Sequence, residues 1–298
     1  MVSFNLQLTT YHLQLTMKLI TTIDEMKEYS REAHRQGKTI GFVPTMGYLH
    51  EGHMSLVKAA REQCDVVVIS IFVNPAQFGP GEDLDRYPRD IERDKRVSEG
   101  CGVDVVFFPS VEDMYPDRYS TYVELTGAFT DTMCGSSRPG HFRGVTTVVS
   151  KLFNIISPNV SYFGQKDAQQ AIVIKRMVDD LNMDTEIRVM PIVREKDGLA
   201  MSSRNACLSE EERKKAPNIF RSLEQAEGFI AAGESSADKV REEMKKILGE
   251  SGGLKIDYLE IVDADDLSPV KAIGGNTLIA VAAFIGRTRL IDNVLIRR

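Results

Sequence analysis

Short apolar runs alternate with amphipathic stretches along the first two thirds of the chain, and this alternation most constrains its fold. The apolar runs predict largely buried strands at residues 39–43, 65–73, 103–109, 160–163 and 186–192. Amphipathic stretches between them predict helices at residues 23–36, 53–63, 90–98, 142–156 and 167–181. Strands that alternate with helices of this length predict an α/β fold with a parallel sheet covered on both faces.

Beyond about residue 205 the pattern changes to charged helices followed by strands. Ser209 with Glu212 three residues later has the capping-box spacing of a helix start, and Pro217 is expected to interrupt or kink that helix. A second charged helix is predicted over residues 237–248. Strand-like segments follow at residues 255–262 and 277–285, and the chain closes on RLIDNVLI. We therefore predict a smaller C-terminal α+β domain.

Composition and charge exclude several classes of protein. With 42% hydrophobic and 27% charged residues, the chain has the balance of a globular protein and is not expected to be disordered. A formal net charge of -6 argues against a nucleic-acid partner, because such binding needs clustered Lys and Arg. The four cysteines show no C-x-x-C spacing, which argues against a zinc ribbon and favours a reducing, cytoplasmic location.

The first 16 residues receive no role. They contain neither Lys nor Arg and no continuous apolar segment, so they do not match a secretory signal peptide. Met17 opens a more natural start, and residues 1–16 are treated as an extension of unknown role. No later segment is apolar for long enough to predict a membrane span, so no membrane partner is expected.

The first predicted strand leads into PTMGYLHEGH at residues 44–53, where a helix is expected to start. Gly47 and Gly52 let backbone N–H groups approach a ligand, and a helix N-terminus favours an anion. His50 and His53 are three residues apart, so one helical turn places both imidazoles on the same side. Neutral imidazoles can donate hydrogen bonds to phosphate oxygens without a large charge to desolvate. The motif favours a phosphate site.

Two other interpretations of the histidine pair stay open at this point. H-x-x-H spacing could bind a metal, although the H-E-x-x-H pattern and a completing Cys/His cluster are missing. The two histidines could also lie on the surface of a turn without a role.

Polar residues also follow two further predicted strands. Asn74 and Gln77 are neutral amides, suited to hydroxyls or a carboxylate, although a Pro/Gly turn with polar filler is an equal alternative. Lys166 is expected in the first turn of the next helix, where a cation opposes the helix dipole unless it faces a phosphate. Gln170 follows one turn later. The alternative is an exposed lysine beside a helix cap at Asp167.

A fourth loop, residues 194–205, contains a D-G turn signal followed by Ser202, Ser203 and Arg204. Two hydroxyls and a guanidinium suit phosphate, although this string is also common on surfaces. Because the carboxyl ends of parallel strands meet at one edge of a sheet, the four loops are expected to converge.

Two segments give weaker signals. RPGHFRGV at residues 138–145 is a plausible lining for a small substrate, and a functional use of His141 stays open. The acidic run at residues 82–94 could include a magnesium ligand, although most of its charges are expected to be solvated.

Together these segments resemble the pantoate–β-alanine ligase family. The motifs PTMGYLHEGH, FVNPAQFGPGEDLDRYPRD, RPGHFRGV, YFGQKDAQQ and VREKDGLAMSSRN occur in the family's order and spacing, from Met17 onward. HEGH and MSSR resemble the HIGH and KMSKS-type signatures of a wider nucleotidyltransferase superfamily. NPAQFG and GQKDAQQ are narrower and decide the resemblance. Cys207 departs from the family, where a Tyr or another larger residue is expected.

The resemblance implies a Rossmann-like, doubly wound parallel sheet over residues 17–192 and a C-terminal lid domain over residues 193–298. It also implies a two-step ligation in which pantoate and ATP form pantoyl adenylate and pyrophosphate, and β-alanine then displaces AMP. It further implies that ATP is a substrate, that Mg²⁺ is required, and that the enzyme is a cytoplasmic homodimer.

The resemblance also implies roles for residues. The catalytic residues are expected to be His53, His50 and Lys166, with His53 as the proton donor. Gln77 and Gln170 bind pantoate, Asn74 lies beside them, and Met46 packs between the substrates. The metal ligand stays unassigned. The residues expected to bind ATP are Met46, Gly47, Tyr48, Leu49, His50, Glu51, Gly52, His53, Gly164, Gln165, Lys166, Asp167, the Val193 backbone, Met201, Ser202, Ser203 and Arg204.

Two alternative functions remain at this point. A nucleotidyltransferase that adds AMP or CMP to a phosphorylated small molecule would need additional cations for its acceptor, whereas this chain offers neutral amides. A non-catalytic nucleotide sensor or RNA-binding relative is a binding-class alternative, and the net acidity argues against RNA.

Overall fold

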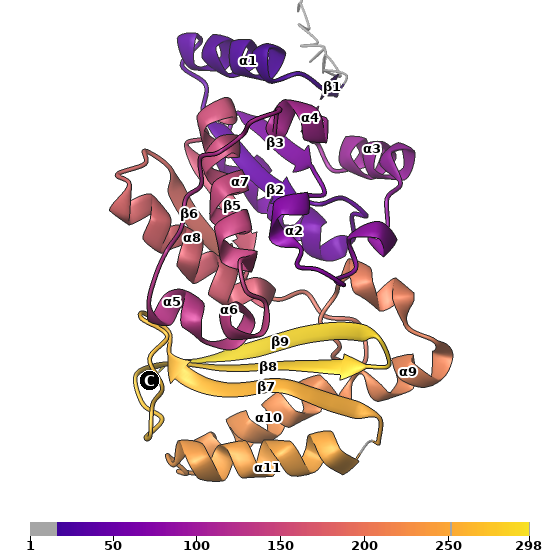
Figure 1. The fold of residues 1–298 in the computed structure, drawn as a ribbon, viewed down its shortest axis with the longest axis vertical. Coiled ribbons are helices and arrows are strands. Elements are labelled where there is room, and N and C mark those ends of the chain that lie inside the picture. Colours follow the sequence, from indigo (N-terminus) through magenta and orange to yellow (C-terminus); the bar gives the residue numbers. More distant parts are fainter. Residues whose placement is uncertain (1–16, 251, 298) are drawn as a thin grey trace, which may run out of the picture.

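A six-stranded parallel sheet forms the centre of the first domain (Figure 1). The computed structural model describes residues 17–250 and 252–297, so residues 1–16 lie outside it. The strand order is β1-β4-β3-β2-β5-β6. The parallel sheet expected from the apolar pattern is confirmed, whereas β1 was missed because only one of its three residues, Ile20, is buried. The strands are β1 (Lys18–Ile20), β2 (Ile40–Thr45), β3 (Val66–Ile71), β4 (Val105–Phe107), β5 (Val160–Gly164) and β6 (Glu186–Met190).

Helices cover both faces of this sheet. Successive strand residues point to opposite faces, so Phe42 packs in the cluster with α1, α7 and α8, whereas Val43 packs in the cluster with α2. The longer helices are α1 (Ile23–Arg35), α2 (Glu51–Gln63), α3 (Ile91–Gly100), α7 (His141–Ile156) and α8 (Ala168–Asp180). Shorter helices are α4 (Val111–Met114), α5 (Ala128–Asp131) and α6 (Met133–Ser137), with 3₁₀ turns η1 (Pro75–Gln77), η2 (Leu84–Arg86), η3 (Gln165–Asp167) and η4 (Ser203–Cys207).

The direction of winding reverses between β2 and β5. Strand β2 pairs with β3 on one side and with β5 on the other, with Gly41 opposite Val160 in the register. The connections that follow β2 and β5 therefore leave the same edge of the sheet at the point where the strand order reverses. Open α/β sheets bind ligands at this place, and both of these connections carry predicted site residues.

The second domain packs helices on a three-stranded antiparallel sheet. Ser209 Oγ accepts from the Glu212 N–H at 3.3 Å and Glu212 accepts from the Ser209 N–H at 2.8 Å, which confirms the capping box. Pro217 separates α9 from α10, as expected. The elements are α9 (Glu210–Lys215), α10 (Asn218–Ala231), α11 (Ala237–Glu250), β7 (Leu254–Asp263), β8 (Asn276–Ile285) and β9 (Thr288–Arg297). None of the helices in residues 17–250 or 252–297 is long and apolar enough to cross a membrane.

The two faces of the small sheet have different neighbours. Helices α10 and α11 cover one face, through Leu223 and Val240 packed against Ile279. On the other face, Leu278 packs in a cluster with Met133 of α6 and Ala168 of α8. The second domain therefore lies directly beyond α6 and the start of α8 (Figure 1). A boundary at residue 192 stays a prediction.

Candidate active site

The HEGH turn places two imidazoles side by side. Helix α2 begins at Glu51, two residues earlier than expected, with His50 as its N-cap. His50 Nδ1 accepts from the Gly52 N–H at 3.2 Å, and His53 Nδ1 accepts from the His50 N–H at 3.3 Å. The two ring centroids are 4.0 Å apart. A neutral imidazole that accepts on Nδ1 carries its proton on Nε2, so both Nε2 atoms are hydrogen-bond donors.

Both histidines are held in the neutral form. Burial, followed by the nearby Lys166 ammonium, lowers the pKa of His50 to about 4. Burial also lowers the pKa of His53 well below its usual range, and the His50 and Lys166 charges act in the same direction. Near pH 7 the pair can therefore donate hydrogen bonds to an anion, whereas a full proton is not available from either ring in this state.

A carboxylate from α3 holds the turn that precedes the histidines. Gly47 and Tyr48 both have positive φ, at 84° and 51°. Asp94 is 1% exposed, and its two oxygens accept from the Tyr48 and Leu49 N–H groups at 2.7 and 2.8 Å. A Cβ on Gly47 would lie 2.9 Å from the Ile71 side chain. Sequence reasoning missed Asp94, because an acidic run does not show which of its members is buried.

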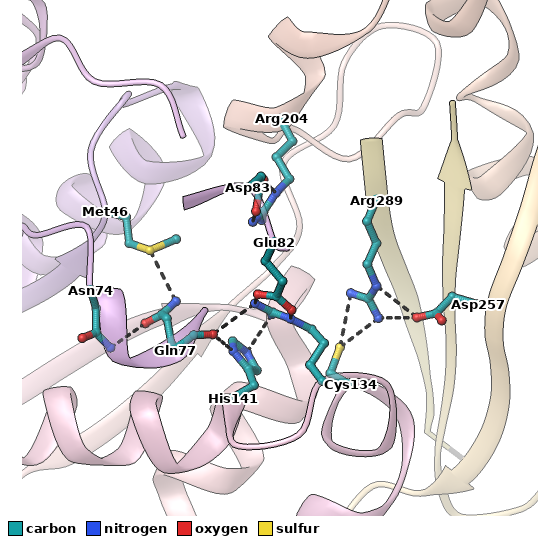
Figure 2. Close-up of polar contacts among 11 residues, drawn as sticks. Met46, Asn74, Gln77, Glu82, Asp83, Cys134, His141, Arg204, Asp257 and Arg289 are labelled. Carbon is teal, nitrogen blue, oxygen red and sulfur yellow. Dashed lines mark hydrogen bonds and ion pairs between the residues drawn. The ribbon is translucent and has the colours of Figure 1, made fainter. Parts of the chain in front are cut away.

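The amide of Gln77 is oriented by buried neighbours (Figure 2). Its Oε1 accepts from Asn74 Nδ2 at 3.1 Å and its Nε2 donates to Met46 Sδ at 3.3 Å. Asn74 is 1% exposed; its Nδ2 also donates to the Gly144 carbonyl, and its Oδ1 accepts from Tyr115 at 2.7 Å. Asn74 therefore orients Gln77 and presents the Gln77 NH₂ group on the Met46 side.

His141 holds the main chain at the same place. The Gln77 carbonyl can only accept, so His141 Nδ1 donates to it at 2.9 Å and His141 Nε2 accepts from Arg138 at 3.0 Å. Arg138 also binds Glu82 through Nε and Nη2, both at 2.7 Å. The use of His141 was left open by the sequence, and the structure shows a positioning contact.

A pH dependence of stability follows from His141. Burial, followed by the Arg138 charge, lowers its pKa to about 4, whereas an unfolded histidine titrates near 6.5. Between these values the unfolded chain binds more protons, so this stability is present above pH 6.5 and is lost as the pH falls toward 4. His141→Gln is expected to reduce the slope of the unfolding free energy between pH 6 and 5 by about 1 kcal/mol per pH unit. Urea unfolding of the wild-type protein and of His141→Gln at pH 6 and pH 5 measures this slope. Equal slopes in the two proteins would contradict a neutral His141.

Lys166 lies in η3, immediately before α8 and not in the first turn of α8, whose N-cap is Asp167. Its Nζ is 3.8 Å from Asp167 Oδ2. Asn293 of β9 donates from Nδ2 to the Gln165 and Lys166 carbonyls at 2.9 and 3.0 Å. The second domain thus supports the lysine loop, a contact over more than 120 residues that no local pattern could indicate.

The Ser-Ser-Arg segment is tied to the loop that follows η1. Ser202 is the N-cap of η4, and its Oγ accepts from the Arg204 N–H at 3.2 Å. The hydroxyls of Ser203 and Tyr87 are 3.0 Å apart. Arg204 binds the Asp83 carboxylate through Nε and Nη2 at 2.7 and 2.9 Å. The loop and this segment therefore form one wall of the site.

Most predicted site residues converge on one cavity of about 220 Å³. This inner cavity shares Lys166, Gln170 and Arg204 with an outer cavity of about 490 Å³ that extends to β9. The predicted residues lining the inner cavity are Met46, His50, Gly52, His53, Asn74, Gln77, Gly164, Lys166, Asp167, Gln170, Val193, Met201, Ser202, Ser203 and Arg204. Those outside its lining are Gly47, Tyr48, Leu49, Glu51 and Gln165.

Three of the predicted residues that do not line the inner cavity pack against other parts of the protein. Leu49 is fully buried in the core beside α2, and Tyr48 lies under the Arg93 guanidinium, 4.9 Å from its ring centroid. Gln165 contacts Asn293. These side chains therefore support the turn before α2 and the Lys166 loop without lining the inner cavity.

The cavity combines neutral donors, cations and amides. Two imidazole N–H groups, one ammonium, one guanidinium and two hydroxyls suit a polyphosphate, and the neighbouring amides suit a small hydroxy acid. Among the described residues there is no group of three His, Cys, Asp or Glu side chains that could hold a metal ion, and both histidine Nδ1 atoms accept from the backbone. The H-x-x-H metal interpretation gains no support from this arrangement.

Known proteins match this chain over nearly its whole length. The family model described as pantoate-beta-alanine ligase matches residues 18–295. Proteins named pantothenate synthetase from Fervidobacterium nodosum and Thermotoga petrophila are each 59% identical over 280 residues, which is 94% of this chain and 99% and 100% of those proteins.

Solved structures of this kind also match over almost their whole length. A pantothenate synthetase from Thermus thermophilus has a TM-score of 0.90 and 43% identity, covering 95% of this chain and 100% of that chain. A pantoate-beta-alanine ligase from Francisella tularensis, complexed with beta-gamma ATP and beta-alanine, has a TM-score of 0.77 and 35% identity, covering 94% of this chain and 97% of that chain. The family model and these relatives cover nearly the whole chain, which therefore belongs to the pantoate–β-alanine ligase family of enzymes.

Proposed function

We propose that this enzyme joins pantoate to β-alanine in an ATP-dependent reaction of two steps, of which only the first consumes ATP. In the first, a pantoate carboxylate oxygen attacks the α-phosphorus of ATP, a new O–P bond forms, and the bond to pyrophosphate breaks. In the second, the β-alanine amine attacks the acyl carbon of pantoyl adenylate, loses a proton and releases AMP. The observation that carries this proposal is the meeting of Gln77 and Gln170 with His50, His53 and Lys166 around one cavity.

The first step brings two anions together, so alignment and charge neutralisation must supply most of the catalysis. The Nε2 donors of His50 and His53 would bind phosphate oxygens while staying neutral. Lys166 would add a point charge, and Ser202, Ser203 and Arg204 would hold the departing pyrophosphate. The Val193 backbone would contact adenine.

The pantoate subsite would be formed by neutral groups. Gln77 and Gln170 would bind the hydroxyl and carboxylate oxygens of pantoate, with Met46 packed between the two substrates. Neutral amides leave the carboxylate nucleophilic, whereas a lysine there would pair with it. Contact of β9 with the lysine loop would keep water from the acyl adenylate when the second domain closes.

The residues fit Mg²⁺ that arrives with ATP. Mg²⁺ needs one or two carboxylates in addition to substrate phosphates and waters, and it would neutralise phosphate charge when bound. Asp167 lines both cavities beside Lys166, and its side chain is 48% exposed, so this carboxylate would be the one to hold the ion. The homodimer and the cytoplasmic location remain predictions.

Isotope exchange between pyrophosphate and ATP tests the proposal. We expect exchange only when pantoate is present, and pantothenate as the product after β-alanine is added. Exchange that ignores pantoate would contradict the proposal. Exchange that requires a phosphorylated acceptor would instead favour a nucleotidyltransferase.

The packing of η1 against α7 leads to a further prediction. A Cβ on Gly144 would lie 2.2 Å from the Ala76 carbonyl oxygen and 2.6 Å from the Gln77 Cα. Gly144→Ala therefore has to displace η1, and we expect the KM for pantoate to rise by about tenfold or more, as for one to two lost hydrogen bonds. Gly100→Ala is the control, since nothing lies within 4 Å of its Cβ position. Steady-state kinetics measure both, and an unchanged KM in Gly144→Ala would exclude η1 from the pantoate subsite.

A further inference from the structure

Two adjacent carboxylates in the loop between η1 and η2 bind different arginines. Glu82 binds Arg138 through two nitrogens, both at 2.7 Å, and Asp83 binds Arg204 through two nitrogens at 2.7 and 2.9 Å. Figure 2 shows Asp83 beside Arg204 and Glu82 on the side of His141. Arg138 precedes α7 and Arg204 lies in η4, so neighbouring side chains reach two separate walls of the outer cavity.

Arg138 has both edges of its guanidinium occupied by protein groups. Glu82 takes the Nε/Nη2 edge, while Nη1 donates to His141 and Nη2 donates to the Gln77 carbonyl at 3.3 Å. Arg138 therefore has little capacity left for a ligand. Arg138 instead links Glu82 to Gln77, the residue whose side-chain amide would line the pantoate subsite.

Arg204 differs from Arg138 in one decisive respect. Asp83 takes its Nε/Nη2 edge, and the structure gives its Nη1 no hydrogen-bond partner within residues 17–250 and 252–297. The Tyr87 ring, with its centroid 5.6 Å from the guanidinium carbon, packs against the group. A guanidinium offers two bidentate edges, so the carboxylate can hold one while the other binds phosphate.

The partial burial of these two ion pairs favours a positioning role. The side chains of Arg138 and Glu82 are 15% and 23% exposed, and those of Arg204 and Asp83 are 26% and 33% exposed. An arginine fixed in this way loses less conformational freedom when a ligand binds, which favours affinity. If Asp83 instead occupied the place of phosphate, its removal would strengthen phosphate binding, so the two roles predict opposite effects.

We propose that Glu82 and Asp83 are positioning residues that serve separate substrates. Glu82 acts through Arg138 and His141 on Gln77, whose side-chain amide would bind pantoate. Asp83 acts through Arg204 on the phosphates of ATP. This inference rests on the proposed function.

The isosteric variants Glu82→Gln and Asp83→Asn test the division. Kinetics of pantoate-dependent exchange are expected to show a KM for pantoate raised about tenfold in Glu82→Gln, with the KM for ATP within about twofold of wild type. Asp83→Asn is expected to raise the KM for ATP and the inhibition constant of inorganic pyrophosphate by about tenfold, with the KM for pantoate nearly unchanged.

Two further variants make the test specific. Asp85→Asn removes a charge from η2, immediately after this loop, at an exposed side chain, and both KM values are expected to stay unchanged. Arg138→Lys keeps the charge but loses the two-nitrogen geometry, so it is expected to reproduce the Glu82→Gln pattern. It also tests the pantoate branch if Glu82→Gln fails to fold, which thermal unfolding monitors.

Each remaining outcome overturns the proposal. Equal rises of both KM values in both variants would show a loop with a general structural role. A lower inhibition constant for pyrophosphate in Asp83→Asn would show that Asp83 occupies the phosphate position, and unchanged constants would show no role. Loss of pantoate dependence in the wild-type enzyme itself would instead contradict the proposed function.

Discussion

His53→Ala is expected to lower kcat by about 10²- to 10³-fold, as for the loss of one donor aimed at charge that develops in a transition state. His53 accepts the His50 N–H on Nδ1, so its Nε2 proton is directed away from the helix end. Depression of its pKa by burial keeps the ring neutral. Single-turnover formation of pantoyl adenylate measures the effect on the first step.

Two matched variants separate the donor from the cap. His53→Asn can still accept the His50 N–H but has no group at the Nε2 position, so we expect it to be as slow as His53→Ala. His53→Gln can place an amide N–H nearer that position, and we expect part of the activity to return. Full activity in a folded His53→Ala would remove the residue from the catalytic set.

Lys166→Met is expected to lower kcat/KM for ATP by about 10²- to 10³-fold, since truncating a partly buried charge that meets an opposite charge costs about 2–5 kcal/mol. The methionine keeps most of the length and the apolar stem of the side chain and removes the ammonium group. The Lys166 side chain is 20% exposed, so water replaces the lost interaction poorly. Lys175→Met on the exposed side of α8 is the control, with no expected change.

Lys166→Met also allows an independent measurement, the pKa values of His50 and His53. The Lys166 ammonium helps to lower the pKa of both His50 and His53. Removing a nearby positive charge favours the protonated imidazole, so these pKa values are expected to rise. NMR titration of the histidine ring protons checks the direction, and unaltered titration would place Lys166 away from the pair.

Much of the fold could be predicted because its pattern is local. The parallel sheet and its covering helices follow from apolar runs and amphipathic periods, and the capping box of Ser209 was confirmed atom by atom. Strand β1 was missed because only Ile20 of its three residues is buried, whereas the equally short β4 is fully buried within an apolar run. Helix α2 begins two residues early because His50, an unusual N-cap, supplies the cap through its ring nitrogen. The residues at which a helix begins and ends depend on individual hydrogen bonds of this kind.

The supporting residues of the site could not be predicted in the same way. Asp94, Arg138 and Asn293 act on residues that lie 46, 61 and 127 positions away in the chain. The local sequence shows Asp94 only as part of an acidic run, Arg138 only as a basic residue before a helix, and Asn293 only as a polar residue in a strand. Which of them is buried, and against what, depends on packing between elements.

By itself the sequence determined the types of chemical group and the order of the loops that carry them, because strand ends in a parallel sheet meet at one edge. Tertiary structure alone decided the state of those groups. Burial next to Lys166 makes His50 and His53 neutral donors, and the Asp83 contact leaves one edge of Arg204 without a protein partner among the described residues. A pKa and a free hydrogen-bonding edge both depend on distances across the fold, and those distances exist only once the chain has packed.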